Sequence, residues 1–146
     1  MALPEHLKTG MRGEQLAARA LRDRGDTVLT AGFRTQLGET DIISLTKDKI
    51  LCFVEVKTRS PGGMFPPSDA VDKEKQARLV NNAAAYIKAV KLDYRAVRFD
   101  IVEVILHDLT HADINIITDA FGQEYFPAVK KESKKGFFGR IKDRER

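Results

Sequence analysis

Two runs of hydrophobic and β-branched residues flank a short polar segment in the first half of the chain. The runs cover residues 38–43 and 51–59, and residues 46–49 read Thr-Lys-Asp-Lys. This pattern is typical of a β-hairpin. Side chains alternate along a strand, so the second run has an aliphatic face and a face that carries charge. The charged face comprises Leu51, Phe53, Glu55, Lys57 and Arg59. The hairpin therefore places Asp41 on the strand next to Glu55 and Lys57.

Hydrophobic spacing predicts two helices and three further strands around this hairpin. One helix is expected from about Leu7 or Gly10 to Arg24, where Gly25 ends it, and the other from near Ser68-Asp69 to about Lys91. The strands are expected at 27–30, 97–106 and 113–118, with a turn or bulge at Gly32 and a Pro- and Gly-rich loop at 60–67. The second helix lies between two strands, so those strands should be parallel. The fold class is therefore α/β, with a mixed central sheet flanked by helices.

Length and charge point to one domain and a basic extension. The chain has 146 residues and a formal net charge of +4. Residues 130–146 carry eight Lys or Arg against three Asp or Glu, so residues 1–129 are close to neutral. We expect a single domain over 1–129 and a flexible basic C-terminal tail over 130–146, which would contact nucleic-acid phosphates or dock its aromatic pair on a partner or second subunit. A homodimer stays open.

The remaining composition indicates a cytoplasmic protein. The only cysteine is Cys52, on the aliphatic face of its strand, which fits a buried, unreactive thiol in a reducing compartment. The N-terminus has no basic start followed by an apolar run, and no stretch approaches the length of a membrane span. We therefore expect no membrane association.

The hairpin carries a group of side chains that could form a catalytic site. Asp41, Glu55 and Lys57 follow the pattern Asp-x13-Glu-x-Lys. Charged groups in so apolar a strand would cost several kcal/mol if unpaired, so they need partners. Mg²⁺ prefers one or two carboxylates together with water and phosphate oxygens. Asp41 and Glu55 are therefore candidate ligands of Mg²⁺ or Mn²⁺, and Lys57 a candidate catalytic residue for phosphodiester hydrolysis.

Several further motifs along the sequence resemble those of a known family. The matching segments are Gly10-x-x-Gly13-Glu14-x-x-Ala17, Gly38-Glu39-x-Asp41, Phe53-Val54-Glu55-Val56-Lys57-Thr58-Arg59, Ala70-Val71, Lys75-Gln76, Leu79, Tyr86 and Phe99-Asp100. Together they resemble the YraN-like family of small bacterial proteins and the PD-(D/E)XK nuclease signature. The resemblance implies a restriction-endonuclease-like fold, related to Holliday-junction resolvases, and nuclease activity. Thr40 departs from it, because the family usually has an aliphatic residue there.

The resemblance also implies further site residues, each with a plainer reading beside it. Glu14 lies on the apolar side of the first helix and would be a third acid of the site, or simply a capping or salt-bridged residue. Lys75 and Gln76 on the second helix would bind nucleic acid, although Lys75 would equally suit the edge of the core. Arg34 is a phosphate contact or a surface charge, and Arg59 belongs to a local basic cluster that also includes Lys57, Lys73, Lys75 and Arg78.

Three classes of function remain at this point. The first is a metal-dependent endonuclease that cleaves DNA, with branched or single-stranded DNA as candidate substrates. The second is a module that keeps the nuclease fold and binds nucleic acid without cutting it. The third is a protein-interaction scaffold, in which the carboxylate cluster would be structural. The presence of both acids and Lys57 favours the first class, because buried charge gathers where function requires it.

Overall fold

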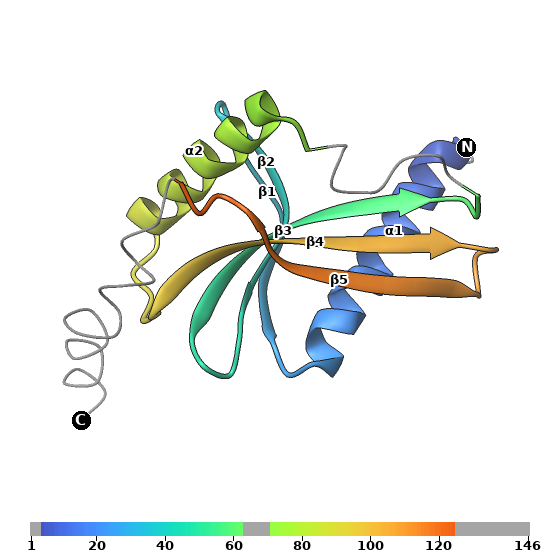
Figure 1. The fold of residues 1–146 in the computed structure, drawn as a ribbon, viewed down its shortest axis with the longest axis horizontal. Coiled ribbons are helices and arrows are strands. Elements are labelled where there is room, and N and C mark those ends of the chain that lie inside the picture. The colour runs from blue at the N-terminus through green and yellow to red at the C-terminus, as the bar shows by residue number, and fades with distance from the viewer. Residues whose placement is uncertain (1–3, 63–70, 125–146) are drawn as a thin grey trace.

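The computed structural model describes residues 4–62 and 71–124. Its elements are, in order, α1 (Glu5–Asp23), β1 (Thr27–Thr35), β2 (Gly38–Leu45), β3 (Ile50–Arg59), α2 (Lys73–Ala89), β4 (Ala96–Leu106) and β5 (Ala112–Phe121). Figure 1 shows the strands fanned into one sheet, with α1 and α2 set against it. The predicted tail at 130–146 and most of the predicted loop at 60–67 lie outside the described residues.

The sheet is mixed, and its strands follow chain order. Its five strands run β1-β2-β3-β4-β5 from one edge to the other. Only β3 and β4 are parallel, paired from Ile50↔Ala96 to Arg59↔Ile105, and the other neighbours are antiparallel. The predicted hairpin and the predicted parallel pair across the second helix are both confirmed. The architecture is α/β and is consistent with a restriction-endonuclease-like fold.

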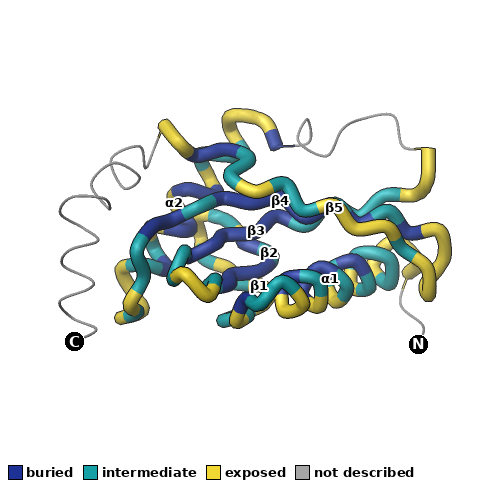
Figure 2. The backbone as a smooth tube through the Cα atoms, turned by 60° about the horizontal axis from the view of Figure 1, so that its bottom comes forward, coloured by how far each residue is buried: buried dark blue, intermediate teal, exposed yellow. Residues whose placement is uncertain are grey.

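Each face of the sheet is covered by one helix. The core under α1 contains the small side chains Ala17 and Ala18 packed on Cys52 and Val54 of β3. The core under α2 is dominated by larger side chains, among them Phe53 on the opposite face of the same strand. Figure 2 shows buried backbone concentrated in the central strands and exposed backbone on the outer side of α1. Because β3 is buried on both faces, its sequence reads as a nearly continuous hydrophobic run.

The ends of the helices partly correct the expectations from sequence. Helix α1 ends at Asp23, one residue before the predicted end, with Arg24 as its C-cap. Gly25 follows with a φ of 103°, a left-handed conformation that glycine adopts without strain. Helix α2 begins at Lys73, so the expected start near residue 68 is wrong. Asp72 is its N-cap, and the carboxylate accepts a hydrogen bond from the Lys75 backbone amide at 2.8 Å. Strand β1 continues through Gly32 to Thr35, so Gly32 is not a turn, and the bulge lies between Val28 and Thr30 instead.

A buried charge network joins the end of α1 to the sheet. Asp100 of β4 is fully buried and accepts hydrogen bonds from Arg98 at 2.9 and 3.0 Å and from Arg24 at 3.3 Å. Arg24 also binds Asp26 at 2.8 Å. Asp100 also accepts a hydrogen bond from the Asp119 backbone amide at 2.9 Å, so these contacts give it a structural role. Cys52 is a buried free thiol whose Sγ accepts a hydrogen bond from Arg24 at 3.8 Å, and burial raises the pKa of this thiol to about 12.

Asn82 anchors the β1–β2 ribbon to α2. Its side chain is fully buried, and its amide nitrogen donates to Thr40 Oγ1 at 3.0 Å and to the Phe33 carbonyl at 3.2 Å. Its amide oxygen accepts from Thr35 Oγ1 at 2.6 Å. Thr40, the residue that departs from the family pattern, thus has a buried polar partner on α2.

Two smaller findings concern surface properties. Leu7 and Met11, expected on the apolar stripe of the first helix, are exposed.

Within the described ranges, neither helix has the length and apolar character needed to cross a membrane.

Candidate active site

Asp41 and Glu55 meet where the pairing of β2 and β3 ends. The ladder between these strands runs from Leu45↔Leu51 to Ile42↔Val54. Asp41 follows one step further on, and its Oδ2 accepts a hydrogen bond from the Val56 backbone amide at 2.7 Å. The Asp41 side chain therefore continues the contact between the strands beyond the last ladder pair. This position brings the Asp41 carboxylate next to that of Glu55.

Glu55 is buried and binds two ammonium groups through one oxygen. Its Oε1 lies 2.8 Å from Lys75 Nζ of α2 and 3.4 Å from Lys57 Nζ of its own strand. The Glu55 side chain is only 7% exposed, against 19% for Lys57 and 32% for Lys75. A buried carboxylate with charged hydrogen-bond partners is far less costly than one left unpaired.

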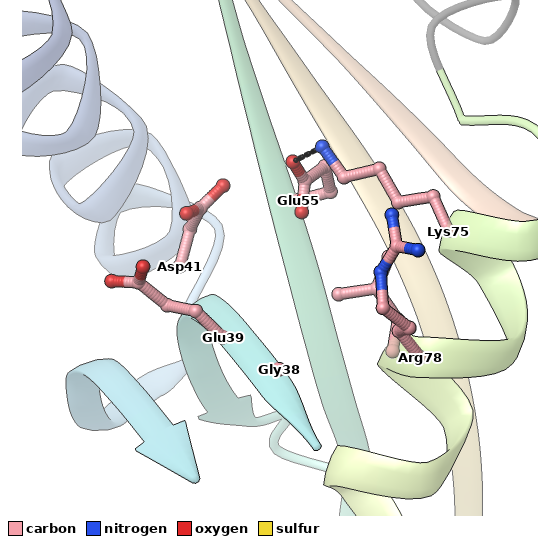
Figure 3. Close-up of a pocket in the computed structure, with 7 residues that line it drawn as sticks. Gly38, Glu39, Asp41, Glu55, Lys75 and Arg78 are labelled. Carbon is pink, nitrogen blue, oxygen red and sulfur yellow. Dashed lines mark ion pairs between the residues drawn. The ribbon is translucent and has the colours of Figure 1, made fainter. Parts of the chain in front are cut away.

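Asp41, Glu55 and Lys75 line a cleft of about 200 Å³ between β2, β3 and α2. Its lining is Gly38, Glu39, Asp41, Glu55, Lys75, Arg78 and Leu79. Figure 3 shows Glu39 and Asp41 on the side nearer α1, Lys75 and Arg78 reaching in from α2, and Glu55 between them. The cleft thus has an acidic side, formed by Glu39, Asp41 and Glu55, and a basic side, formed by Lys75 and Arg78. Glu55 joins the two sides through its ion pair with Lys75.

Burial and mutual repulsion perturb the acidic side. Burial, together with the charge of Glu55, raises the pKa of Asp41 to about 7, although the Val56 amide opposes this shift. Burial also raises the pKa of Glu14, with contributions from Glu39 and Glu55. Glu14 is therefore within electrostatic reach of the same carboxylates. The acidic side carries more negative charge than its surroundings neutralise.

The two lysines respond to the site in opposite directions. Burial lowers the pKa of Lys57, and the neighbouring ammonium of Lys75 lowers it further. Burial alone would also lower the pKa of Lys75, but its hydrogen bonds to Glu55 and Lys57 and the charges of Glu55 and Asp41 together outweigh burial and raise this pKa. Lys75 is thus the more firmly charged of the two groups.

Glu14 reaches the site because α1 crosses β3 at very short range. A Cβ atom on Gly13 would overlap the hydroxyl of Thr58 and lie 2.9 Å from its Cβ. Only glycine allows this approach. Gly10, one turn earlier in α1, has no atom within 4 Å of an added Cβ, so close packing does not require glycine there.

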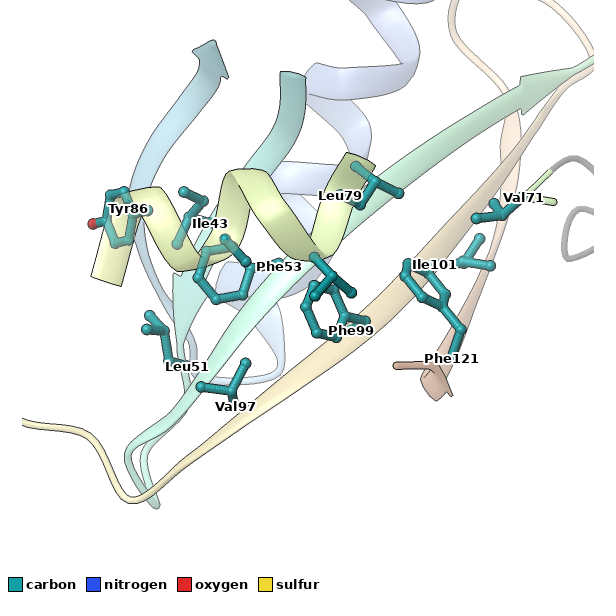
Figure 4. Close-up of a cluster of buried hydrophobic side chains, with 12 residues drawn as sticks. Ile43, Leu51, Phe53, Val71, Leu79, Tyr86, Val97, Phe99, Ile101 and Phe121 are labelled. Carbon is teal, nitrogen blue, oxygen red and sulfur yellow. The ribbon is translucent and has the colours of Figure 1, made fainter. Parts of the chain in front are cut away.

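Hydrophobic packing beneath α2 fixes the basic side. Leu79 lines the cleft and belongs to the core in Figure 4, where α2 lies over the aromatic side chains of the sheet. The Phe53 ring stacks on the Phe99 ring, with 5.6 Å between the ring centroids, and makes an edge-to-face contact with the Tyr86 ring, with 5.9 Å between the centroids. Such aromatic contacts add to the burial energy and fix geometry. Lys75 is therefore presented from a well-anchored helix.

The other residues predicted to bind nucleic acid surround the cleft without lining it. Arg34 is 74% exposed and pairs with Glu39 at 2.8 Å on the β1–β2 ribbon. Arg59 ends β3, and Gln76 donates to the Val71 carbonyl at 2.9 Å. The Arg59 Nε and Gln76 Oε1 atoms are buried and have no hydrogen-bond partner within the described ranges.

Glu39 and Arg78 also line the cleft. Glu39 was not a candidate site residue from the sequence, and it pairs with Arg34 while also facing the site. Arg78 was named only as a member of the local basic cluster. Glu39 stands two positions before Asp41, which is the spacing of one strand face. Arg78 stands three positions after Lys75, which is the spacing of one helix face. These two spacings were the signals that could have identified them.

The donor set suits a divalent cation only if solvent and substrate complete it. Within residues 4–62 and 71–124, no group of three or more His, Cys, Asp or Glu side chains is arranged to hold a metal ion. Asp41 and Glu55 nevertheless provide two adjacent carboxylates with raised local negative potential. That number matches Mg²⁺, which keeps several waters and takes phosphate oxygens as ligands.

The sheet is mixed and lies between two helices, with Asp41 on β2 and with Glu55 and Lys57 on β3, the strand before the crossover helix. This arrangement places the protein among restriction-endonuclease-like α/β proteins. Comparison with known proteins narrows this class. Residues 13–104 match the model of "Uncharacterised protein family UPF0102". The chain belongs to this family, the YraN-like group that its sequence resembles.

Individual relatives agree with this assignment. A UPF0102 protein of Clostridium perfringens is 38% identical over 77% of this chain and 92% of its own length. One of Solibacter usitatus is 48% identical over 66% of this chain and 74% of its own. One of Caldanaerobacter subterraneus is 41% identical over 77% of this chain and 93% of its own. The similarity thus spans most of each relative.

Proposed function

We propose that the protein is a divalent-metal-dependent endonuclease that hydrolyses DNA phosphodiester bonds. The observation that carries the proposal is the two-sided cleft, in which the carboxylates of Asp41 and Glu55 lie opposite Lys75 and Arg78, with the Lys57 ammonium beside Glu55. Phosphodiester hydrolysis needs both kinds of group, because a cation must be held while negative charge develops on the phosphate.

The acidic side would hold the metal. Asp41 and Glu55 are the candidate ligands of Mg²⁺ or Mn²⁺, and Glu14 would orient water around the ion from α1. The bound ion would supply Lewis acidity and a more acidic water molecule. The Val56 amide holds the Asp41 carboxylate in place, so this part of the site is preorganised.

The basic side would hold the phosphate. Lys57 is mostly buried beside Glu55, where its ammonium would stabilise the charge that develops on the phosphate or orient the attacking water. Lys75 and Arg78 reach into the cleft from α2 and would contact the non-reacting phosphate oxygens. Arg34, Arg59 and Gln76 would contact neighbouring nucleotides outside the cleft.

A binding module without cleavage is the second candidate. One observation favours it: Glu55 is already paired with two lysines, and no three-ligand metal cluster is present in the described part of the chain. Such a module would use the basic side alone to hold DNA phosphates. Branched and single-stranded DNA are candidate ligands in either case, and a homodimer stays a prediction.

A cleavage screen separates the two candidates. Single-stranded, flap and four-way DNA would each be incubated with the full chain in Mg²⁺ or Mn²⁺, beside Glu55→Gln as the matched variant. The nuclease proposal expects cleavage that requires both the ion and Glu55. If every substrate stays intact while DNA still binds, the binding module is the better account.

A further inference from the structure

The pairing of Glu55 raises the question of how a metal ion would reach it. Both ammonium groups contact Oε1, and the Lys75 contact of 2.8 Å is the shorter. A dication held between Asp41 and Glu55 would therefore lie close to an ammonium group, and like charges at such distances repel by about 1 kcal/mol even in water and by more in a buried site.

Lys75 is the group that has room to leave. Lys57 stands two positions from Glu55 on the same buried strand and is the less exposed of the two lysines. Lys75 stands at the start of α2 on a four-carbon side chain that is about one third exposed. A lysine with a flexible stem can change rotamer at modest cost. Departure of Lys75 would also relieve its repulsion of the Lys57 ammonium.

We propose that the Lys75 ammonium occupies the cation site at Glu55 in the metal-free protein. A divalent metal ion displaces this ammonium from Glu55, and Lys75 then binds a phosphate of the substrate. This inference rests on the proposed function. In the metal-free protein, Lys75 neutralises Glu55 and stabilises the packing of α2 against β3. Once metal neutralises Glu55, the ammonium is free to contact substrate. Metal and substrate binding are thereby coupled through one side chain.

The first experiment measures metal affinity without substrate. Mn²⁺ is titrated into the full chain and followed by electron paramagnetic resonance, for the wild type, Lys75→Met, Arg78→Met and Glu55→Gln. Arg78→Met is the matched control, because Arg78 lines the same cleft one turn along α2 but pairs with Glu74 at 3.0 Å. Both methionine variants remove one positive charge from the cleft, and only Lys75→Met removes an ammonium group that contacts Glu55.

Displacement predicts that Lys75→Met tightens Mn²⁺ binding roughly fivefold or more beyond any effect of Arg78→Met, on the usual scale of coupling between sites. Equal effects in the two variants, or weaker binding in Lys75→Met, would overturn the inference while leaving a Glu55-dependent metal site intact. If Glu55→Gln binds Mn²⁺ like the wild type, and Lys75→Met gains no site, the proposed function itself fails. A site that is measurable only in Lys75→Met would support the displacement strongly.

A second experiment observes Lys75 directly. Lysine ammonium groups held in buried ion pairs exchange slowly enough to give ¹⁵N signals in NMR spectra, and Lys75→Met assigns the Lys75 signal. Titration with Mg²⁺ should shift or remove that signal and leave the Lys57 signal in place. If the Lys75 signal is unaffected at Mg²⁺ concentrations that saturate the Glu55-dependent site, Lys75 remains on Glu55 and the inference is wrong.

Discussion

Asp41 of β2 accepts a hydrogen bond from the Val56 amide of β3 over 2.7 Å, so one carboxylate of the cleft is fixed by the backbone of the strand that carries the other. The hydrogen bond favours the charged form of Asp41. Burial and the charge of Glu55 act against it and dominate, which is why the pKa of Asp41 rises to about 7.

This raised pKa makes the stability of the metal-free protein depend on pH. Asp41 takes up a proton more readily in the folded state than in the unfolded state, where its pKa is near 3.8. Its contribution to stability is therefore present below about pH 4 and is lost as pH rises towards 7. The Asp41→Asn variant lacks this pH-dependent contribution, because an amide does not ionise in this pH range. We expect the melting temperature of the variant to rise relative to the wild type by roughly 5 °C between pH 4 and 7.5.

Thermal unfolding in EDTA, followed by circular dichroism across this pH range, checks the prediction. The wild type and the variant differ in charge but little in shape, so the comparison isolates the ionisation of Asp41. A constant difference in melting temperature from pH 4 to 7.5 would show that Asp41 is not strongly perturbed.

Lys57 should matter for the rate of cleavage more than for binding. Its ammonium would act on charge that develops during the reaction, so Lys57→Ala should lower the cleavage rate about 10²-fold, the scale known for loss of one electrostatic donor. Binding should change little, because other cations also contact the phosphates. Single-turnover cleavage and fluorescence anisotropy measure the two effects. An unfolded Lys57→Ala protein would instead identify a structural ion pair.

Gly13 should be intolerant of any side chain. Gly13→Ala forces a methyl group into Thr58, and we expect a loss of about 2 kcal/mol in the free energy of unfolding, as is typical of overpacking. Gly10→Ala, in the same helix, meets open space and should stabilise the protein by up to about 1 kcal/mol. Urea denaturation of both variants gives the comparison. Combining Gly13→Ala with Thr58→Ala should restore most of the lost stability, and failure to do so would exclude this contact as the cause.

The basic extension should govern the salt dependence of DNA binding. Residues 130–146 carry a net charge of +5, whereas the rest of the chain carries −1. Deletion of these residues should weaken DNA binding and make the slope of log affinity against log salt concentration shallower, because fewer counterions are released. Binding isotherms at several salt concentrations provide the slope. An unchanged slope would remove the extension from the binding surface.

The hairpin and the two faces of its second strand were accessible from sequence because they depend on local signals. Alternation along β3 separated Phe53 and Glu55 from Cys52 and Val54, and the structure places these pairs on opposite faces. The start of α2 was not accessible in the same way. Val71 is buried in the α2 core and looked like part of the helical pattern, yet the Asp72 cap fixes the first helical residue at Lys73.

The site was accessible only in part, because some of its properties arise from tertiary contacts. Spacing alone indicated that Asp41, Glu55 and Lys57 would lie near one another. That Lys75 would bind Glu55 more closely than Lys57 does depends on how α2 crosses the sheet, which no local pattern encodes. The same holds for Glu14, whose position follows from the Gly13–Thr58 approach.

The parallel pairing of β3 with β4 has a consequence for how the molecule folds. β2 and β3 are joined by a short turn, whereas the register Ile50↔Ala96 closes a long stretch of chain that includes α2. Local contacts form first, because long loops cost more entropy to close. A partly folded chain would then carry Asp41 and Glu55 together before Lys75 arrives to neutralise them. Divalent ions in the refolding buffer should bind that intermediate and change the refolding rate, which stopped-flow measurements with and without Mn²⁺ can detect.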